Sequence, residues 1–410
     1  MTTTPSPAAT SAAPSATVPH LDIDPFSEEF LTDPLPFHER LRETAPVTYL
    51  DSHRVYAVAR YDDVHRALID WQGLQSAAGV GLANFRREKP WRPPSVLLEA
   101  DPPRHDAPRS VLAKLLSPRR LRALEAQWRS DARDVVDELL SRGREFDAVT
   151  DLAEVFPLRV FPDAIGIGQE GREHLLPYGD FAFNAFGPQN RLVTQAQETI
   201  GPTMAWIGEQ CRRESLSSHG IGAQIWAAAD RGDITTEQAP LVVRSLLTAG
   251  VDTTVTGIAS VLHMMADRPE DWRRVREDRS LLPRVFEEAV RLESPVQTFF
   301  RTTTQTVEIA GVRIPADEKV LMFLGAANRD RRRWQDPHAF DLDRDPSGHV
   351  GFGMGIHQCV GQHIARLEAV SVLDALLDRV TALESAGPVR RHLNNTLRGF
   401  ESLPMRLTAA

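Results

Sequence analysis

A long run of helical pattern occupies the middle of the chain and constrains the fold more than any other feature. The spacing of apolar residues is largely helical over residues 117–293, and residues 235–269 form one unit of that pattern. Thr235 and Gln238 make a capping-box signature at its start, and a proline closes its end. We therefore predict one helix of roughly 30 residues, well above the usual three turns. Gly250, in its middle, costs about 1 kcal/mol relative to alanine, which indicates a packing or functional reason for it.

The other regular patterns add a short β part and one further helix. Residues 306–314 alternate in polarity around an Ala-Gly pair, as in a hairpin. After Cys359, apolar residues recur every three or four positions over residues 364–380, which predicts a buried helix. The sequence thus predicts a mainly α fold with a smaller β-rich part. Residues 1–20, rich in Thr, Ser, Ala and Pro, are expected to be a flexible tail, and residues 21–410 a single domain.

Composition excludes several classes of protein. The net charge of −9 argues against a general nucleic-acid binder. No run of about 18 apolar residues occurs, so no membrane-spanning helix is expected. The first residues lack the basic and apolar regions of a secretory signal. The two cysteines, Cys211 and Cys359, make no disulfide framework, and a cytoplasmic monomer is the simplest expectation.

Cys359 lies in an unusual setting, with glycines at positions 351, 353, 355 and 361 and a helical pattern directly after it. A helix N-terminus offers free backbone N–H groups and a partial positive charge, both of which favour a thiolate. Such a thiolate suits a metal ligand or a nucleophile paired with His357. A zinc site is less favoured, since no CxxC pair or histidine cluster accompanies it. The remaining alternative is a small buried apolar residue, which free cysteine often is.

The segment "FGMGIHQCVG", residues 352–361, matches Phe-Gly-x-Gly-x-His-x-Cys-x-Gly and resembles the haem-binding signature of cytochromes P-450. Three further segments resemble that family's motifs in the family's order: "AGVDTT" at 249–254, "EAVR" at 288–291 and the meander "NRDRRRWQDPHAFDLDR" at 328–344. The resemblance implies the P-450 fold, in which a helical domain encloses haem b, iron protoporphyrin IX. It also implies a monooxygenase that inserts one atom of O2 into its substrate.

The resemblance assigns the haem contacts. Cys359 is expected to be the axial iron ligand, whose electron donation favours O–O cleavage. The other expected contacts with the porphyrin and its propionates are His105, Arg109, Ala249, Arg301, Phe352, His357 and Gly361. The segment "PPRHDAPR" departs from the commoner His-Thr-Arg-x-Arg form, and Pro108 is expected to interrupt the helix that carries Arg109.

Three more roles follow from the same resemblance. Thr253 is expected to hydrogen-bond dioxygen and Asp252 to relay protons from water. The alternative is that Thr253 merely bonds back to a carbonyl one turn earlier. Glu288 and Arg291, three positions apart on one helix face, are expected to form a structural pair that ties the helix to the meander.

Apolar and basic segments suggest the substrate. An enzyme of this kind has a mostly apolar pocket with few polar anchors. The predicted substrate contacts are Arg92, Ser95, Leu98, Phe183, Phe186, Arg244, Ser245, Val296 and Phe299. "KPWRPPS", with these phenylalanines, is similar to bacterial P-450 enzymes that oxidise para-substituted benzoates, including 4-methoxybenzoate by O-demethylation. The arginines and serines would then hold the carboxylate. The alternatives are ordinary core packing for the aromatic residues and a solvated loop for the basic ones.

The chain carries no flavin or nucleotide fingerprint, so electrons are expected from a separate ferredoxin with an NADH-linked reductase. Lys114, Arg119, Arg122 and Arg366 are expected to form its docking face. The alternatives are a peroxide-driven peroxygenase, a P-450 that acts on another small apolar substrate, and a non-catalytic haem carrier or gas sensor. An intact Asp252–Thr253 pair argues against the peroxygenase.

Overall fold

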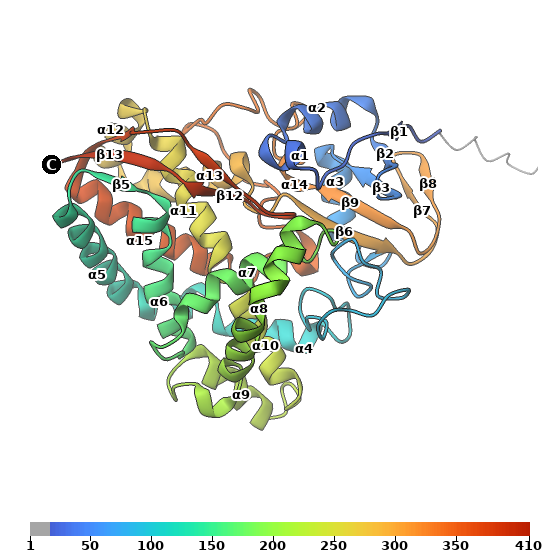
Figure 1. Cartoon of the computed structure of the whole chain (residues 1–410), viewed down its shortest axis with the longest axis horizontal. Coiled ribbons are helices and arrows are strands. Elements are labelled where there is room, and N and C mark those ends of the chain that lie inside the picture. The colour runs from blue at the N-terminus through green and yellow to red at the C-terminus, as the bar shows by residue number, and fades with distance from the viewer. Residues whose placement is uncertain (1–16) are drawn as a thin grey trace, which may run out of the picture.

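Helices are the main regular structure of the protein in the computed structural model, which describes residues 17–410 (Figure 1). The α-helices are α1 (Glu28–Thr32), α2 (Leu35–Thr44), α3 (Tyr61–Ile69), α4 (Asp106–Leu115), α5 (Pro118–Arg142), α6 (Val155–Ile165), α7 (Leu175–Asn184), α8 (Arg191–Gln210), α9 (Ile221–Asp230), α10 (Gln238–Ala249), α11 (Asp252–Met265), α12 (Pro269–Glu277), α13 (Leu282–Glu293), α14 (Leu324–Ala327) and α15 (Gln362–Arg379). The strands are β1 (His20–Leu21), β2 (Val47–Leu50), β3 (Val55–Val58), β4 (Leu74–Gln75), β5 (Glu145–Asp147), β6 (Thr298–Thr303), β7 (Val307–Ile309), β8 (Val312–Ile314), β9 (Lys319–Phe323), β10 (Val380–Ser385), β11 (Arg390–Leu393), β12 (Arg398–Ser402) and β13 (Pro404–Ala409). The predicted mainly α fold with a smaller β part is confirmed.

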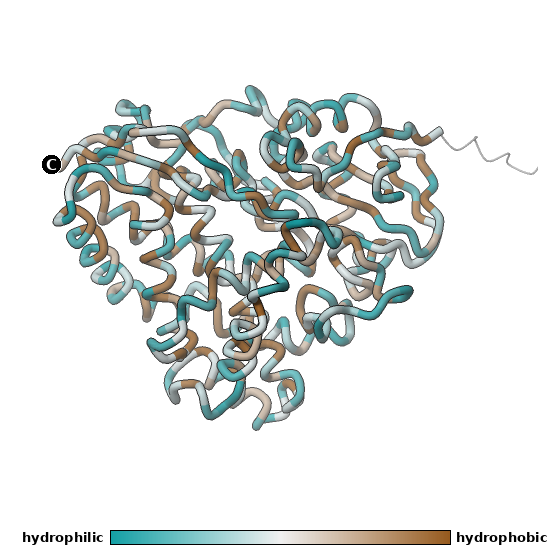
Figure 2. Tube along the Cα trace, in the orientation of Figure 1, coloured by the Kyte–Doolittle hydropathy of each residue, from teal (hydrophilic) through white to brown (hydrophobic). Residues whose placement is uncertain are grey.

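The helical part is built around α15, against which α5, α11 and α13 all pack, and α11 also packs against α13. On α5, Trp128, Val135 and Leu139 are buried at helical spacing and share one face. Figure 2 shows this alternation of hydrophobic and hydrophilic stretches along the helices. The buried helix predicted after Cys359 is α15, which supplies Ile364, Leu373 and other residues to the same apolar core.

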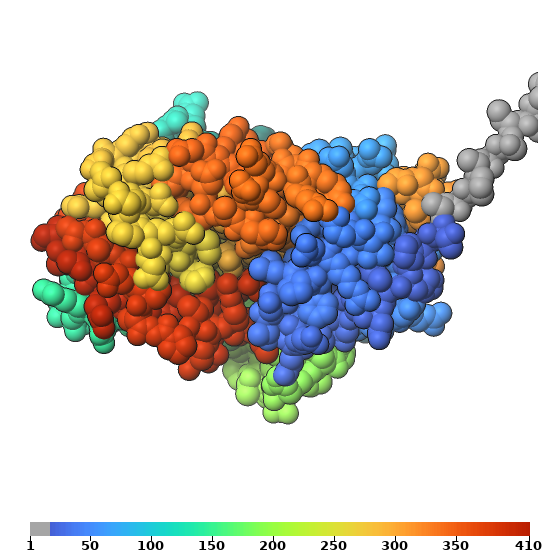
Figure 3. All heavy atoms as spheres, turned by 90° about the horizontal axis from the view of Figure 1, so that it is seen from above, coloured from blue at the N-terminus to red at the C-terminus, as the bar shows by residue number. Residues whose placement is uncertain are grey.

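The β part is dominated by a sheet with the strand order β1-β2-β3-β9-β6-β4. It joins segments from opposite parts of the chain, because β3 pairs in parallel with β9. Figure 3 shows the N-terminal segment packed directly against the segment near residue 320. On β9, Val320 and Met322 enter one apolar cluster and Leu321 and Phe323 another, so this strand is buried on both faces. On β6, Phe299 and Arg301 are two positions apart and therefore share a face.

The predicted hairpin is also confirmed. Strands β7 and β8 pair in antiparallel fashion, with Ile309 opposite Val312. The two residues between them, Ala310 and Gly311, have φ values of 48° and 81°. Left-handed backbone at both positions is what a two-residue hairpin turn requires.

The long central helix differs from the prediction. Its capping box is present, since the Thr235 N–H donates to Gln238 Oε1 at 2.9 Å and the Gln238 N–H donates to Thr235 Oγ1 at 3.2 Å. However, the helix is interrupted at Gly250 and Val251, between α10 and α11. A Cβ at Gly250 would overlap the ring of Phe161, so close packing against α6 explains the glycine.

The span Gln238–Met265 is long and apolar enough to cross a membrane by composition, with a mean hydropathy of 1.3. Its most apolar 18-residue window is 72% buried inside the protein, as in the core helix of a globular fold. Of the predicted tail, residues 1–20, the structure describes only residues 17–20; the rest lie outside the described residues. His20 opens β1 and pairs with Tyr49 of β2.

Candidate functional site

One largely apolar cavity collects almost all of the predicted site residues. It lies where α10, α11, β6, the start of α15 and the loop before α4 meet. On the cysteine side it is lined by Arg109, Ala249, Thr253, Arg301, Phe352, His357, Cys359 and Gly361. On the predicted substrate side it is lined by Arg92, Ser95, Leu98, Phe183, Phe186, Arg244, Ser245, Val296 and Phe299. His105 and Asp252 are the two predicted residues that do not line it.

The loop before α15 presents the sulfur of Cys359 to this cavity. Gly353 and Gly355 have φ values of 66° and 68°, a left-handed backbone that favours glycine. The Cys359 N–H donates to the Phe352 carbonyl oxygen at 2.7 Å, which closes the loop. Backbone N–H groups of Gly361 and Gln362 are near enough to the sulfur to lower the pKa of the thiol. The loop therefore aims the sulfur with main-chain groups alone.

The sequence predicted that this setting would favour a thiolate, but burial acts against it. Burial raises the pKa of the Cys359 thiol above its usual value, although the Gly361 N–H and the guanidinium of Arg109 both lower it. The thiolate therefore needs a cation at the sulfur, and coordination to a metal ion removes a thiol proton outright. Cys211 differs, because burial in the apolar core raises its pKa to about 12 and it has the character of a small apolar residue.

The other interpretations of Cys359 find no support. Among residues 17–410, no group of three or more His, Cys, Asp or Glu side chains could hold a metal ion, so a zinc site is not supported. The His357 Nε2 atom pairs with Asp101 Oδ1 at 3.1 Å and is therefore engaged away from the sulfur. A Cys/His nucleophile pair would need the opposite orientation.

The polar groups beside the cysteine fit a haem with its propionates. His105 is only 3% exposed, and its Nε2 atom has no hydrogen-bond partner in the described part of the chain. Its ring lies 4.7 Å from that of His357, measured between ring centroids. Burial lowers the pKa of Arg301 to about 10, so this guanidinium also lacks sufficient counter-charge. An unpaired buried donor beside a buried cation requires an anionic acceptor, which propionate oxygens would supply.

The expected interruption of the helix by Pro108 is wrong. Helix α4 begins at Asp106, so Pro108 lies in its first turn. Proline is tolerated there because the first N–H groups of a helix have no partner within the helix. Arg109 is consequently held in a regular helix, with its N–H donating to the His105 carbonyl oxygen at 3.1 Å, and it lines the cavity.

Thr253 and Asp252 point in different directions. The Thr253 hydroxyl lies at the cavity and donates to the Ala249 carbonyl oxygen at 3.0 Å, so the alternative of a bond back to the previous turn is present too. Asp252 points toward α7, where a Cβ at Gly179 would overlap its Oδ2 atom. Burial, with a contribution from Asp180, raises the pKa of the Asp252 carboxyl well above its usual value. Its buried Oδ2 has no partner among the described residues.

Behind Asp252 lies a polar network that the sequence did not reveal. The Asp180 carboxylate accepts hydrogen bonds from His392 Nε2 and Asn394 Nδ2, both at 2.7 Å, and from Asn184 Nδ2 at 3.1 Å. The bond to Asp180 raises the pKa of His392, which lies on the partly exposed strand β11. No local signal marks His392 and Asn394, because they come from a segment more than 200 residues away from Asp180.

The apolar side of the cavity is formed by aromatic rings that meet edge to face. Phe183 meets Phe186 edge-on with 5.8 Å between centroids, and Phe186 meets Phe299 at 6.1 Å. Leu98 and Val296 pack against the same cluster. These residues are both core and cavity wall, so core packing and substrate contact are compatible.

The predicted polar anchors gather at one end of the cavity. The Ser95 and Ser245 hydroxyl oxygens are 3.2 Å apart, and Arg244 Nη2 donates to the Pro93 carbonyl oxygen at 2.7 Å. Arg92 Nη1 donates to Glu99 Oε2 at 2.9 Å. We call these five residues, Arg92, Ser95, Glu99, Arg244 and Ser245, the polar end. The alternative interpretation of the basic residues as a solvated loop is wrong for Arg92, whose side chain is only 8% exposed. It is correct for Arg87, whose side chain is 58% exposed and pairs with Asp317.

Sequence reasoning missed Glu99, although it stands in the same segment as Arg92. A buried arginine needs a nearby carboxylate. Once Arg92 was predicted to line a pocket, a search of its own segment for a carboxylate could have found Glu99.

The Glu288–Arg291 pair is buried and structural, as predicted. Both side chains are fully buried, with Arg291 Nε 2.7 Å from Glu288 Oε2 and Arg291 Nη2 2.8 Å from Glu288 Oε1. Arg291 also donates to the carbonyl oxygen of Asn328 at 2.7 Å, and Arg344 donates to Glu288 at 3.0 Å. The pair therefore fixes α13 to the meander that leads into the cysteine loop.

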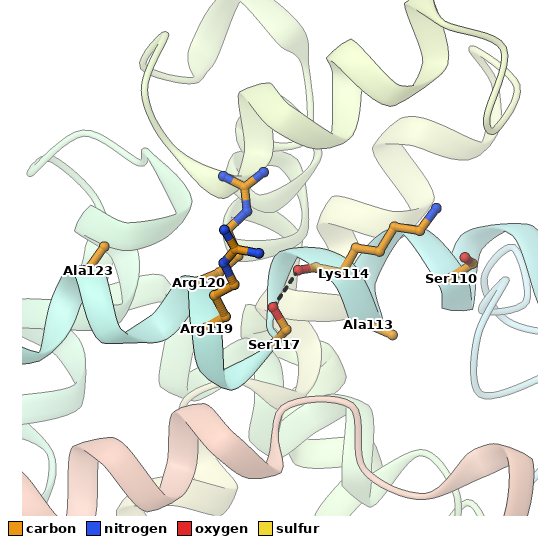
Figure 4. Close-up of a pocket in the computed structure, with 7 residues that line it drawn as sticks. All are labelled: Ser110, Ala113, Lys114, Ser117, Arg119, Arg120 and Ala123. Carbon is orange, nitrogen blue, oxygen red and sulfur yellow. Dashed lines mark hydrogen bonds between the residues drawn. The ribbon is translucent and has the colours of Figure 1, made fainter.

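The predicted docking residues are only partly available. Figure 4 shows a shallow hollow between the end of α4 and the start of α5, with Lys114, Arg119 and Arg120 around it. Arg122 is exposed on the same helix. Arg366 differs from the prediction, because its Nε atom pairs with Glu287 Oε1 at 2.5 Å and its guanidinium covers the Phe352 ring. Three of the four predicted cations therefore remain as a basic surface.

Comparisons with known proteins agree with this geometry. Residues 184–392 match the family described as Cytochrome P450. The chain is 56% identical to cytochrome P450 CYP199A2 of Rhodopseudomonas palustris over 412 residues, which covers 100% of both chains. Among solved structures, CYP109Q5 from Chondromyces apiculatus superposes with a TM-score of 0.79 at 33% identity and covers 95% of this chain and 99% of its own. Cytochrome P450 CREJ in complex with (4-ethylphenyl) dihydrogen phosphate has a TM-score of 0.82 at 25% identity and covers 94% and 99%.

Three features agree with these matches: a half-buried cysteine in a glycine-rich loop, the unpaired His105 Nε2 atom suited to a propionate, and the buried Glu288–Arg291 pair. The chain belongs to the cytochrome P450 family and is a haem-thiolate monooxygenase.

Proposed function

We propose that this P450 oxidises small para-substituted aromatic carboxylates, by hydroxylation or by oxidative O-demethylation of benzoates such as 4-methoxybenzoate. The observation that carries the proposal is the polar end. There, Arg92, Arg244 and two serine hydroxyls meet in a cavity whose other walls on the substrate side are apolar. Arginine and serine donors are suited to a carboxylate. Ser245 lies one helical turn from Ala249, so a carboxylate at this end leaves the para substituent near the cysteine side.

The aromatic wall supports a flat substrate. Phe183, Phe186 and Phe299 offer ring faces and edges at distances typical of aromatic packing. A benzoate ring can occupy this wall without bringing a polar group into contact with it. The same wall makes the substrate side of the cavity apolar.

The residues around the haem divide the remaining tasks. When bound, the haem supplies the reductive activation of O2, which its thiolate ligand promotes. In this cavity Cys359 would hold the iron, and His105, Arg109, Arg301 and His357 would hold the propionates. Thr253 presents its hydroxyl at the cavity. Asp252 keeps a proton at its buried carboxyl, because burial raises its pKa, and the Asp180–His392 network links that region to the surface.

Electrons come from a ferredoxin served by an NADH-linked reductase. The hollow at Lys114, Arg119 and Arg120, with Arg122 beside it, supplies the basic surface that an acidic ferredoxin requires. The enzyme acts as a cytoplasmic monomer, with neither nucleic acid nor membrane as a partner.

A binding titration tests the substrate class. The haem-loaded protein is titrated with 4-methoxybenzoate and with its methyl ester, and the change in haem absorbance gives both dissociation constants. The acid should bind at least about tenfold more tightly, because charge-assisted hydrogen bonds contribute about 1.5–3 kcal/mol. Equal affinity for acid and ester would reject the carboxylate anchor. A turnover assay that detects 4-hydroxybenzoate and formaldehyde then tests the reaction.

The same turnover assay separates the other activities. Product with NADH, reductase and ferredoxin supports the monooxygenase route, whereas product with hydrogen peroxide alone would indicate a peroxygenase. No product from a panel of benzoates, with product from an uncharged aromatic compound, would indicate a different small apolar substrate.

A further inference from the structure

We propose that Glu99 is a specificity-determining residue, which sets the polar end to one net positive charge and so selects substrates with a single negative charge. The inference rests on the proposed function, because it takes the substrate anion to bind beside Arg92 and Ser95. It goes beyond that function by assigning the choice between singly and doubly charged head groups to a residue that does not line the cavity.

Glu99 is locked in place by the segment that carries it. Its Oε2 atom accepts hydrogen bonds from Arg92 Nη1 at 2.9 Å and from the Ser95 N–H at 2.7 Å. Its own N–H donates to the Ser95 carbonyl oxygen at 3.1 Å. The side chains of Glu99 and Arg92 are 3% and 8% exposed, so the pair is shielded from bulk water. Two donors and a local turn thus hold the carboxylate where a substrate anion cannot displace it easily.

The pair leaves part of Arg92 free for a ligand. Glu99 and the Pro93 carbonyl oxygen take the Nη1 atom. The Nε atom is buried and has no hydrogen-bond partner within residues 17–410. A buried N–H without an acceptor is costly, so this edge of the guanidinium indicates an acceptor from outside the chain. The paired hydroxyls of Ser95 and Ser245 lie in the same cavity and can share that acceptor.

The charges at the polar end do not cancel. Arg92 and Arg244 contribute two positive charges, because guanidinium groups stay protonated in proteins. Burial and the nearby Arg92 lower the pKa of Arg244, whereas Glu99 raises it, so the three groups interact. With Glu99 as the carboxylate, one positive charge remains. A single negative charge on the ligand neutralises the polar end. A second negative charge on the ligand would have no counter-charge in a site that is shielded from bulk water.

The next cation, Lys319, adds only a fraction of a charge to this count. Burial, together with Arg301, lowers the pKa of Lys319 to about 7, so it carries only part of a charge near neutral pH. Its ammonium group donates to the Gly79 carbonyl oxygen at 2.8 Å and is engaged by the main chain.

A structural relative shows that an aryl phosphate can occupy this fold. Cytochrome P450 CREJ was solved with (4-ethylphenyl) dihydrogen phosphate. At pH about 8, well above its second pKa of about 6, a phosphate monoester carries close to two negative charges, whereas a benzoate carries one. A residue that changes the net charge of the polar end by one unit is therefore sufficient to move the preference between these two head groups.

The experiment compares three ligands in the haem-loaded wild-type protein and two variants at pH about 8, where the phosphate is doubly charged. The ligands are 4-methoxybenzoate, its methyl ester and 4-methoxyphenyl phosphate, and their dissociation constants come from calorimetry and haem absorbance. E99Q removes the charge at nearly constant size, and E99D keeps the charge. The readout is the ratio of the benzoate and phosphate dissociation constants, which a purely structural role would leave unchanged.

Wild type and E99D should prefer the benzoate. E99Q should shift the ratio toward the phosphate by about tenfold or more, because a unit charge a few ångströms away acts more strongly on the doubly charged ligand. A ratio that stays the same in E99Q would overturn the proposal. If E99Q does not fold, the wild type decides, because equal binding of benzoate and phosphate contradicts the proposal as well. Equal binding of benzoate and ester, by contrast, would overturn the proposed function itself.

Discussion

The two ends of the cavity are built in different ways. At the cysteine end, main-chain N–H groups of Gly361 and Gln362 reach the sulfur, and two glycines with positive φ shape the loop. At the polar end, side chains from α10 and from the loop before α4 meet, and a buried Arg92–Glu99 pair holds them. A main-chain cradle tolerates little change in sequence. An end made of side chains can change its charge by one substitution, so we expect the cysteine end to define the chemistry and the polar end to define the substrate.

The largest expected effect comes from Cys359→Ser. The variant should lose monooxygenase activity and the shifted absorbance that reduced, thiolate-ligated haem shows with carbon monoxide, because the anionic sulfur ligand is gone. The matched control is Cys211→Ala, which removes the other cysteine, 4% exposed in the core. That variant should keep the absorbance. A normal spectrum in Cys359→Ser would contradict the assigned ligand.

The second effect separates turnover from binding. Asp252→Asn removes the acidic proton at the buried carboxyl next to Gly179. Product formation should fall by about a hundredfold, which is the usual contribution of a positioned proton donor. The dissociation constant for 4-methoxybenzoate should not change, because Asp252 does not line the cavity. Steady-state turnover with measured peroxide release, together with a binding titration, checks both halves.

The third effect is a loss of substrate affinity without a loss of turnover, the reverse of the second. Arg92→Lys keeps a cation for Glu99 but removes the guanidinium edge that carries the unpaired Nε. Affinity for 4-methoxybenzoate should fall by about tenfold, while the rate at saturating substrate stays near that of the wild type. Arg87→Lys, on the exposed part of the same loop, is the control and should change neither quantity. A loss of turnover without a loss of affinity would show that the two ends are not separable.

The smallest effect concerns buried carboxyls near the cysteine end. Glu368, on α15, is fully buried without a partner in the described chain, and burial raises its pKa well above the usual range. In the folded protein Glu368 therefore keeps its proton, whereas in the unfolded chain it loses the proton above its ordinary pKa of about 4.3. The free energy of unfolding consequently falls as the pH rises above about 4.3. Glu368→Gln should raise the free energy of unfolding at neutral pH by about 1 kcal/mol, and denaturation of the haem-loaded protein measures it.

Glu287→Gln is the matched control with the opposite sign. Burial alone would raise the pKa of Glu287, but its bonds to His349 and Arg366 lower it to about 2. Its contribution to stability is complete above the unfolded pKa of about 4.3 and is lost as pH falls toward about 2. The variant should therefore be less stable than the wild type at neutral pH, and the difference should disappear in acid. A loss of stability in both variants at neutral pH would contradict the assigned protonation of Glu368.

What the sequence could predict follows from the same contrast between the two ends. The cysteine loop, the capping box at Thr235 and the hairpin at Ala310 depend on neighbouring residues, so local sequence is enough to find them. The break at Val251 could not be found, because the helical pattern of the sequence continues through it. The close approach of Phe161 to Gly250 could not be found either, because Phe161 comes from a distant helix. The direction of Asp252 toward Gly179 depends on a contact of the same kind.

Charge pairs were the other limit. The sequence placed Arg366 on a docking surface, but Glu287 and the Phe352 ring engage it. It assigned Arg92 to the substrate without its buried partner Glu99. Whether an arginine is free or paired depends on carboxylates brought close by the fold, and residue type alone does not report that.

The parallel pairing of β3 with β9 has a consequence for how the protein is made. The ribosome must add more than half of the chain after β3 before its partner exists, which takes on the order of tens of seconds at about 5–20 residues per second. During that interval the nascent β2–β3 hairpin exposes an unpaired edge, which is prone to aggregate. Phe299 and Arg301 lie on β6, which pairs with β9 in the same sheet. The nascent chain therefore cannot form the complete haem cavity until β9 has been synthesised and has paired with β3.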